Sequence, residues 1–320
     1  MRANINSYVE DFARRGEETA YASRRGLRQA RWSYARVARA AYSFARELEA
    51  RGVGRGERVL LWAANGPEWV AAFLGCSLAG VVVVPLDVES APDFVARVGE
   101  QTTPRLILLD AETAERGRGL ADVPSLLLEG LEETTARHSA EAFAREVAPD
   151  DLLEIIFTSG TTAEPRGVLL SHRNFLANLG PLEEEINRYI KWERPFHPIR
   201  FLNLVPLSHV FGQFMGIFVP QLLGGEVHFQ NSLNPSEMVE TIRRERVSVV
   251  VAVPRMLESL REHVERHEAA RGRGDAFARA LEGAKGAHPL RKWWTFRRVH
   301  RRFGLKFWAF VTGGATLPEE

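Results

Sequence analysis

The stretch Leu-Leu-Glu-Ile-Ile-Phe-Thr-Ser-Gly-Thr-Thr-Ala-Glu-Pro-Arg-Gly, residues 152–167, joins an apolar run to a loop rich in glycine and hydroxyl side chains. The run 152–157 predicts a buried strand. Ser171 predicts the cap of a helix that begins near His172. The loop 158–167 is therefore expected to lie between a strand and a helix.

The composition of this loop suits a polyphosphate ligand. Gly160 and Gly167 permit backbone conformations in which amide N–H groups point toward anionic oxygens. Arg166 adds a planar cation that matches phosphate geometry. No Gly-x4-Gly-Lys-Ser/Thr pattern is present, which removes the main support for a P-loop kinase or GTPase. Rotatable hydroxyl donors complete the loop: Thr158, Ser159, Thr161 and Thr162.

The residues before the loop alternate between helical and strand patterns. Strands are expected at 58–62, 81–84 and 105–110, and helices at 67–79 and 92–100. Residues 111–150 are polar and rich in Glu, and we interpret them as a connection between sheet regions. A first helix is expected from Ser33 until Gly52, with apolar residues at helical spacing: Val37, Ala40, Ala41, Phe44, Ala45 and Leu48. This rhythm predicts an α/β fold of parallel-rich sheets layered with helices.

The residues after the loop continue the α/β pattern. Strands are expected at 201–205, 226–229, 247–253 and 307–311, and Asn234 with Pro235 predicts a helix start. The chain stops at Glu320, shortly after a strand and before any helix that would cover it. We therefore expect a truncated chain, an incomplete domain with approximate subregions 1–150 and 151–320.

Overall composition is that of an ordinary globular protein. The 320 residues include 42 Lys and Arg against 41 Asp and Glu. With charges this balanced, the protein as a whole has no electrostatic field that would attract nucleic acid or an anionic membrane. The single cysteine, Cys76, excludes an intrachain disulfide and suits a reducing compartment. No secretory signal opens the chain, and the apolar stretch 69–86 is interpreted as a helix, a glycine and a buried strand rather than a membrane span. The expected location is the cytoplasm.

Residues 158–167 resemble the signature loop of the adenylate-forming superfamily, which includes acyl-CoA synthetases, luciferases and the adenylation domains of peptide synthetases. The resemblance implies that the loop binds the phosphates of ATP, and it makes Ser159 and Thr161 candidates for holding Mg²⁺. The pattern departs from the family at Ala163, where glycine is usual, and at Arg166, where lysine is usual.

Two later segments resemble further motifs of the same superfamily. Residues 205–212, Val-Pro-Leu-Ser-His-Val-Phe-Gly, resemble the motif whose histidine lies between the nucleotide and carboxylate pockets. His209 is thus the candidate active-site residue, expected to orient the carboxylate or adenylate. Residues 311–318 resemble the segment beside the adenine and the acyl group. By this resemblance Gly313, Gly314 and Ala315 would form a wall of that pocket.

The resemblance covers nearly the whole chain and is strongest to long-chain fatty acyl-CoA synthetases. It implies ATP-dependent conversion of a fatty acid, or another carboxylic acid, to acyl-AMP and then to acyl-CoA, with ATP, Mg²⁺ and coenzyme A taking part. Family members continue beyond this segment into an acidic motif, a ribose-binding aspartate, a hinge and a small C-terminal domain with a catalytic lysine. This chain is accordingly expected to be catalytically incomplete.

Three alternatives stay open. One is a fatty-acyl-AMP ligase or carrier-protein-loading enzyme, and another is a non-catalytic nucleotide-binding remnant. The third concerns the basic and aromatic segment 291–302, which suits contact with an anionic membrane surface, at the inner face of the membrane. The simpler interpretation of that segment is a solvated helix face whose aromatic side chains pack inward.

Overall fold

The computed structural model describes residues 2–25, 28–117, 123–158, 164–193 and 196–314. The chain divides into two compact units. The first contains Met1–Pro198 and Pro206–Phe229, and the second contains Ile199–Val205 and Gln230–Glu320. Both are built from strands and helices, so the α/β class expected from the sequence is confirmed. The subregions 1–150 and 151–320 stay a prediction.

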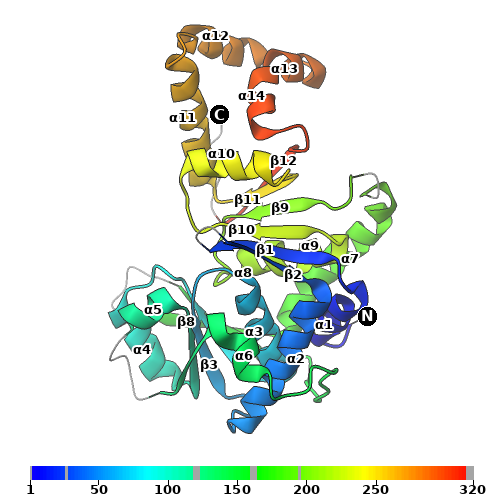
Figure 1. Ribbon diagram of the computed structural model, residues 1–320, viewed down its shortest axis with the longest axis vertical. Helices are drawn as coiled ribbons and strands as arrows, with labels where there is room; N and C mark the ends of the chain where they lie inside the picture. Colours follow the sequence, from blue (N-terminus) through cyan, green and yellow to red (C-terminus); the bar gives the residue numbers. More distant parts are fainter. Residues whose placement is uncertain (1, 26–27, 118–122, 159–163, 194–195, 315–320) are drawn as a thin grey trace. The chain divides into compact units, whose positions relative to one another are not determined.

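A six-stranded sheet with the order β6-β5-β3-β4-β7-β8 is the frame of the first unit. Its neighbouring strands are parallel except for β7 with β8, which are antiparallel. Figure 1 shows α4 and α5 on one side of this sheet and α3 on the other. The elements are β3 (Arg58–Trp62), α3 (Pro67–Leu78), β4 (Val82–Leu86), α4 (Pro92–Thr102), β5 (Leu106–Leu109), α5 (Ala111–Arg116), β6 (Ser125–Leu127), β7 (Leu152–Thr158) and β8 (Arg166–Ser171).

The expectation that residues 111–150 only connect sheet regions is wrong. They contain α5, the edge strand β6, the 3-10 turn η1 (Leu128–Gly130) and α6 (Leu131–Thr135). β6 pairs in parallel with β5, with Leu126 opposite Leu108. A strand of three residues at a sheet edge needs one buried side chain, here Leu126, and so leaves little pattern in the sequence.

Helix α3 explains the long apolar stretch 69–86. All of its residues are buried, and it is followed by Gly80 at φ +67° and then by the buried strand β4. This is the helix, glycine and strand that the sequence predicted. Cys76 lies inside α3, and burial raises the pKa of its thiol. Among the described residues, no helix is both long enough and apolar enough to cross a membrane.

Helix α2 (Tyr34–Ala50) packs against α3 through a glycine. A Cβ atom on Gly75 would lie 2.8 Å from Phe44 Cδ1 and 2.9 Å from the Ala41 carbonyl oxygen. The two helices therefore approach more closely than any larger residue would allow. Ser33 caps α2 by accepting a hydrogen bond from the Arg36 N–H, as its place before the apolar pattern predicted.

The first unit also contains β10, β1 and β2, side by side in that order. β1 is parallel to β10 and antiparallel to β2, and Tyr21 of β1 stacks on Phe229 of β10. The pairing of β1 with β2 was not predicted, because arginines dilute the alternation of apolar residues there. The remaining elements are α1 (Asn6–Arg15), β1 (Thr19–Arg25), β2 (Arg28–Ser33), α7 (His172–Glu193), α8 (Val210–Gln213), the π-helical turn η3 (Phe214–Phe218), α9 (Val219–Leu223) and β10 (Glu226–Phe229).

The second unit has three parallel strands in the order β12-β11-β9. Its core joins these strands to α10, α11 and α14 through buried aliphatic side chains and Phe303. Asn234 caps α10 by accepting from the Ser236 N–H, as predicted. Figure 1 shows α11 to α14 running out from the strands and back. The bounds are β9 (Arg200–Asn203), α10 (Pro235–Arg244), β11 (Val249–Ala252), α11 (Pro254–Ala269), α12 (Gly274–Ala284), α13 (Pro289–Thr295), α14 (Arg297–Phe303) and β12 (Ala309–Thr312).

Candidate functional site

The loop expected to bind phosphate leaves β7 and returns as β8. The prediction that it leads directly into a helix is therefore wrong: Thr158 ends β7, Arg166 begins β8, and α7 starts only at His172. The apolar residues 168–170 continue the chain as a strand before Ser171, whose hydroxyl accepts from the Asn174 N–H in the first turn of α7. Five members of the loop lie outside the described residues, so their predicted roles stay predictions: Ser159, Gly160, Thr161, Thr162 and Ala163.

Arg166 and Gly167 lie at the base of the loop. Arg166 is exposed and stands opposite Thr158 in the β7–β8 register. Gly167 stands opposite Phe157, and a Cβ atom there would lie 2.7 Å from Ile155 Cγ2. Glycine at position 167 therefore has a second explanation besides the backbone freedom expected of a phosphate-binding loop: a larger side chain would collide with β7.

The parallel strands β3, β4, β5 and β7 end at one edge of their sheet. Polar residues follow three of them: Asn65 comes after β3, Asp87 after β4, and Asp110 after β5. The loop 158–167 leaves β7 at this same edge. In open α/β sheets, ligands bind in the crevice outside the carboxyl ends of the strands. The strand order therefore places the expected phosphate loop where such sheets bind their ligands.

His209 reaches this edge from the segment before α8. Its Nε2 atom lies 3.7 Å from Asp87 Oδ2, and its side chain is 54% exposed. The Leu207 N–H donates to Asn65 Oδ1 at 2.8 Å, which fixes the same segment to the end of β3. The structure thus brings His209 to the sheet edge at which the loop 158–167 leaves β7. Asn65 and Asp87 were not predicted as site residues, although Asp87 directly follows a buried strand, which is a recognisable signal.

Gly212 holds the backbone beside His209 in a tight arrangement. A Cβ atom on Gly212 would lie 2.0 Å from the Pro206 carbonyl oxygen, so no other residue fits without movement of the backbone. The His209 N–H donates to this Pro206 oxygen, and the Gln213 N–H donates to the His209 oxygen in the first turn of α8. Proline, histidine and glycine in the motif therefore each have a part in shaping this turn.

A buried polar pair lies one turn beyond His209. Gln213 Nε2 donates to Glu154 Oε2 at 2.8 Å, and both side chains are fully buried. Burial raises the pKa of Glu154 to about 8, although the Gln213 hydrogen bond opposes the shift. Glu154 belongs to β7, so the pair connects the strand of the phosphate loop to the helix that follows His209. The signal that sequence analysis missed is an ionisable residue inside the apolar run 152–157.

The glycine segment after β12 belongs to the second unit. Gly314 has φ +82°, and no atom of the residues that the structure describes lies within 4 Å of an added Cβ. Gly313 is half-buried, and Ala315 lies outside the described residues. The proposed contact of these residues with the adenine and acyl group stays a prediction.

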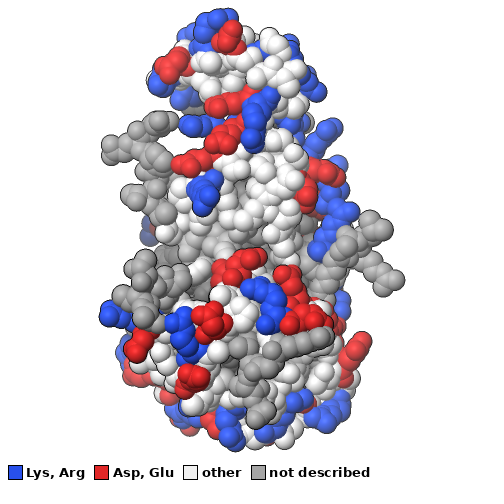
Figure 2. Space-filling view, turned by 90° about the vertical axis from the view of Figure 1, so that its left-hand side faces the viewer, with Lys and Arg blue, Asp and Glu red and all other residues white. Residues whose placement is uncertain are grey.

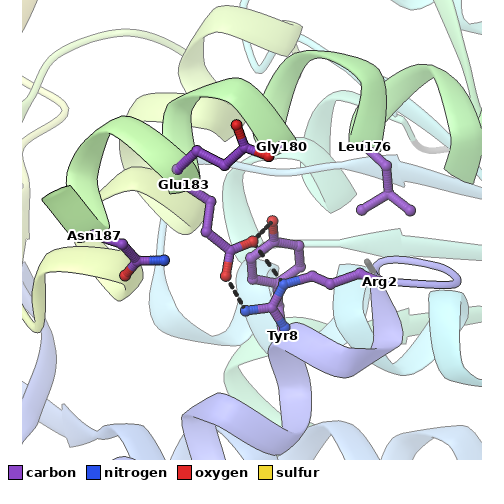
Figure 3. Close-up of a pocket in the computed structure, with 7 residues that line it drawn as sticks. Arg2, Tyr8, Leu176, Gly180, Glu183 and Asn187 are labelled. Carbon is purple, nitrogen blue, oxygen red and sulfur yellow. Dashed lines mark hydrogen bonds and ion pairs between the residues drawn. The ribbon is translucent and has the colours of Figure 1, made fainter.

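A cavity of about 420 Å³ lies between α1 and α7, away from the strand ends. Figure 3 shows the side chains of Arg2, Tyr8 and Glu183 turned toward one another. Arg2 donates to both carboxylate oxygens of Glu183, at 2.8 and 2.6 Å, and Tyr8 donates to Glu183 at 3.2 Å. The Arg2 hydrogen bond lowers the pKa of Glu183. This cluster is already neutralised, and we assign it a structural role at the N-terminus.

Charges on the described surface are mixed. Figure 2 shows acidic and basic side chains interspersed over one face, in keeping with the formal net charge of +1. Among the described residues, no group of three His, Cys, Asp or Glu side chains is arranged to hold a metal ion. The candidates for Mg²⁺, Ser159 and Thr161, fall outside that part of the chain.

Comparison with known proteins identifies relatives of this chain. A fatty acid–[acyl-carrier-protein] ligase of Mycobacterium marinum is 28% identical over 268 residues, which are 80% of this chain and 49% of the relative. The 4-coumarate–CoA ligase 3 of Oryza sativa subsp. japonica is 26% identical over 233 residues, 70% of this chain and 41% of the relative. The chain thus spans about half the length, or less, of these curated relatives.

The fold is also found in a solved structure. The inhibitor-bound N-terminal domain of FACL13 from Mycobacterium tuberculosis has a TM-score of 0.72 and 23% sequence identity, over 99% of this chain and 71% of that one. This chain therefore shares the fold of that N-terminal domain. The profile of the family described as AMP-binding enzyme matches residues 9–320, and this chain belongs to that family.

Proposed function

We propose that this chain forms the nucleotide- and carboxylate-binding part of an ATP-dependent ligase that activates a fatty acid. The observation that carries the proposal is the meeting of two motifs at one sheet edge. The loop 158–167 leaves β7 there, and His209 is held there beside Asp87 and through the Leu207–Asn65 hydrogen bond. Cytoplasm is the proposed location.

In this proposal each motif has a separate task. The backbone and hydroxyls of residues 158–162, with Arg166 and Gly167, bind the ATP phosphates. His209 orients the carboxylate, while residues 313–315 contact the base and acyl group. A carboxylate oxygen attacks the α-phosphorus, pyrophosphate leaves, and acyl-AMP forms. The thiol of coenzyme A then attacks the acyl carbon and AMP leaves.

Donors fixed around the phosphates would stabilise the charge that develops as pyrophosphate departs. Mg²⁺ is part of the proposal as a counter-charge to the phosphates, and hydroxyls of Ser159 and Thr161 are its proposed contacts.

The test measures nucleotide binding before activity. ATP binding to the folded chain is expected to stabilise it by about 2.7 kcal/mol at a ligand concentration of about 100 times Kd. Arg166→Ala should weaken this stabilisation, whereas Arg188→Ala, which alters an exposed arginine on α7, should leave it unchanged. Pyrophosphate release is then measured with this chain and with the longest protein that its gene encodes.

A panel of carboxylic acids decides the substrate class through ATP–pyrophosphate exchange. Exchange with long-chain fatty acids supports the proposal. Exchange with short or aromatic acids alone would contradict the fatty acid assignment. ATP binding without exchange by the longer protein would favour the non-catalytic nucleotide-binding remnant.

A carrier protein is the alternative acceptor of the acyl group. The Mycobacterium marinum relative is named as a ligase that uses an acyl carrier protein, whereas the Oryza sativa relative is named as a CoA ligase. Incubation of preformed acyl-AMP and the longer protein with coenzyme A, or with a phosphopantetheinylated carrier protein, separates the two. The thioester that accumulates identifies the acceptor.

Peripheral contact with a membrane is a second proposal, which one observation favours. Trp293 and Trp294 are 51% and 63% exposed, so the expectation that the aromatics of this segment pack inward is wrong for these two. Leu290 beside them is also exposed. Between residues 283 and 318 the sequence has eight Lys and Arg residues and no Asp or Glu. Exposed tryptophan among cations is the composition that binds anionic lipid surfaces.

Vesicle sedimentation tests this contact. Binding to vesicles with phosphatidylglycerol, but not to pure phosphatidylcholine, is expected, and Arg291→Glu with Lys292→Glu should abolish it. Arg14→Glu with Arg39→Glu makes the same change in net charge on exposed arginines of the first unit and should bind as before. Loss of vesicle binding in the longest encoded protein would show that the segment is instead an internal surface.

A further inference from the structure

Glu154 is a buried acidic residue, and no cation among the described residues pairs with it. Its neighbours across the sheet are Val83 of β4 and Leu170 of β8. Its polar contact is the amide of Gln213, at 2.8 Å. The shift in its pKa arises from burial and from this one hydrogen bond, and no charged group in the described part of the chain contributes to it. A buried carboxylate without a counter-charge is costly, so the neutral acid is favoured.

The hydrogen-bonding atoms left over in this pair fit a protonated acid. Glu154 Oε1 and Gln213 Oε1 are both buried, and neither has a hydrogen-bond partner within the described ranges of the chain. Two acceptor oxygens cannot bond to each other, but a proton on Glu154 makes its Oε1 a donor. A carboxylic acid and a carboxamide then form two hydrogen bonds: the amide N–H donates to the acid carbonyl, and the acid O–H donates to the amide oxygen. One proton would therefore satisfy both orphan oxygens.

We propose that Glu154 is a neutral carboxylic acid that forms a two-bond acid–amide pair with Gln213, and that this pair positions His209 relative to the phosphate loop. The second half of this inference rests on the proposed function. Glu154 lies four residues before Thr158 on β7, and Gln213 lies four residues after His209. The pair is thus a direct side-chain bond between the two elements that carry the expected site.

Both residues are positioning residues, because neither touches the substrates in this proposal. Their effect passes through the backbone: the Gln213 N–H donates to the His209 oxygen, and Gly212 beside it fits tightly under Pro206. A displaced Gln213 side chain would therefore shift the turn on which His209 lies.

The protonation state is tested without any assay of ligase activity. Infrared spectroscopy at neutral pH should show the C=O band of a protonated carboxylic acid, and Glu154→Gln should remove it. Across the range from about pH 5 to about pH 8, the unfolded chain has lost this proton and the folded chain keeps it, so the wild type should lose stability relative to Glu154→Gln as the pH rises. If the wild type showed no such band, and if its stability depended on pH in the same way as that of Glu154→Gln, the proposal that Glu154 is protonated would be overturned.

The positioning role is tested with variants that separate it from stability. Glu154→Gln keeps two amide hydrogen bonds with Gln213, and the exchanged pair Glu154→Gln with Gln213→Glu keeps one acid and one amide. Both should retain the wild-type rate of ATP–pyrophosphate exchange in the longest encoded protein. Glu154→Leu alone leaves the Gln213 amide unpaired in the interior and should lower the midpoint of urea unfolding.

The double variant Glu154→Leu with Gln213→Leu gives the deciding measurement. Replacing both polar partners by apolar groups should recover most of the stability that the single variant loses. Its kcat should nevertheless stay reduced while its KM for ATP changes little, because His209 is displaced and the phosphate loop is not. Wild-type stability with wild-type kcat in this variant would overturn the positioning role. Absence of exchange in the wild type would instead count against the proposed function, and would leave the infrared result standing.

Discussion

At the scale of single residues, His209 combines an accessible side chain with a fixed backbone. Its imidazole is more than half exposed and faces Asp87, while hydrogen bonds and close packing hold the main chain on both sides. An orienting group needs both properties, since a misplacement of about 1 Å can cost roughly a hundredfold in rate.

His209→Ala should lower kcat for ATP–pyrophosphate exchange by about 100-fold in the longest encoded protein, because the carboxylate loses the group that orients it. The apparent affinity for ATP should change little, since the proposed phosphate contacts belong to a different segment, residues 158–167. Arg188→Ala is the control, because this exposed arginine on α7 has no part in the proposed site and should leave kcat unchanged. An unchanged kcat in His209→Ala would remove this residue from the site.

Gly212→Ala should destabilise the first unit by about 1–3 kcal/mol, because the new methyl group meets the Pro206 carbonyl oxygen at 2.0 Å. Gly99→Ala in α4 is the matched control, since nothing among the described residues lies within 4 Å of its added Cβ and alanine favours the helix. Urea unfolding of both variants provides the measurement. Equal midpoints would mean that the turn relaxes without cost.

At the scale of elements, helix α3 lies wholly in the interior of the first unit. It is buried on all sides, and its contact with α2 depends on Gly75. An apolar helix of this kind has no amphipathic stripe, because neighbours cover its whole circumference. The distance between α2 and α3 is therefore set by Gly75, which has no side chain to hold the two helices apart.

Gly75→Ala should therefore destabilise the protein, although alanine is the better helix former. Overpacking against Phe44 and the Ala41 backbone is expected to cost about 1–3 kcal/mol, more than the roughly 1 kcal/mol that helix propensity returns. Gly283→Ala in α12 has free space and should be stabilising. Thermal unfolding monitored by circular dichroism should move in opposite directions for the two variants.

Elements with strong periodicity or clear caps were predictable from the sequence. Helix α2, strand β4 and the start of α10 fall where their patterns placed them. The strand β8 was missed because its two ends carry features of a loop and of a helix cap, and its three apolar residues are largely exposed. Glu154 was missed for a different reason: its partner Gln213 is distant in the sequence, and no local pattern predicts the pair.

At the scale of the whole molecule, two buried ionisable groups, His172 and Glu154, have opposite effects on how the free energy of unfolding changes with pH. Burial lowers the pKa of His172 from 6.5 to about 4, and burial raises that of Glu154 from 4.5 to about 8. Between pH 4 and pH 6.5 the unfolded chain protonates His172 and the folded chain does not, so this histidine lowers stability as the pH falls. Glu154 lowers stability as the pH rises from 4.5 to about 8.

Substitution of His172 should reveal the opposing group. His172→Gln removes a contribution of up to about 3 kcal/mol to the loss of stability on acidification. The variant should therefore be less sensitive than the wild type as the pH falls from 6.5 to about 4, with denaturant midpoints as the measurement. In the double variant with Glu154→Gln, stability should change neither as His172 does on acidification nor as Glu154 does on raising the pH. Identical curves for wild type and His172→Gln would show that this imidazole does not stay neutral when folded.

The lone cysteine of the chain has a practical consequence. Cys76 is enclosed in α3, and burial favours its protonated form, so it should be silent toward thiol reagents in the native protein. A second cysteine at an exposed position such as Glu164, at the end of the phosphate loop, would then be the one site that a maleimide dye labels. Because Cys76 should not react, a single fluorophore at residue 164 could report how the addition of ATP changes the environment of that loop.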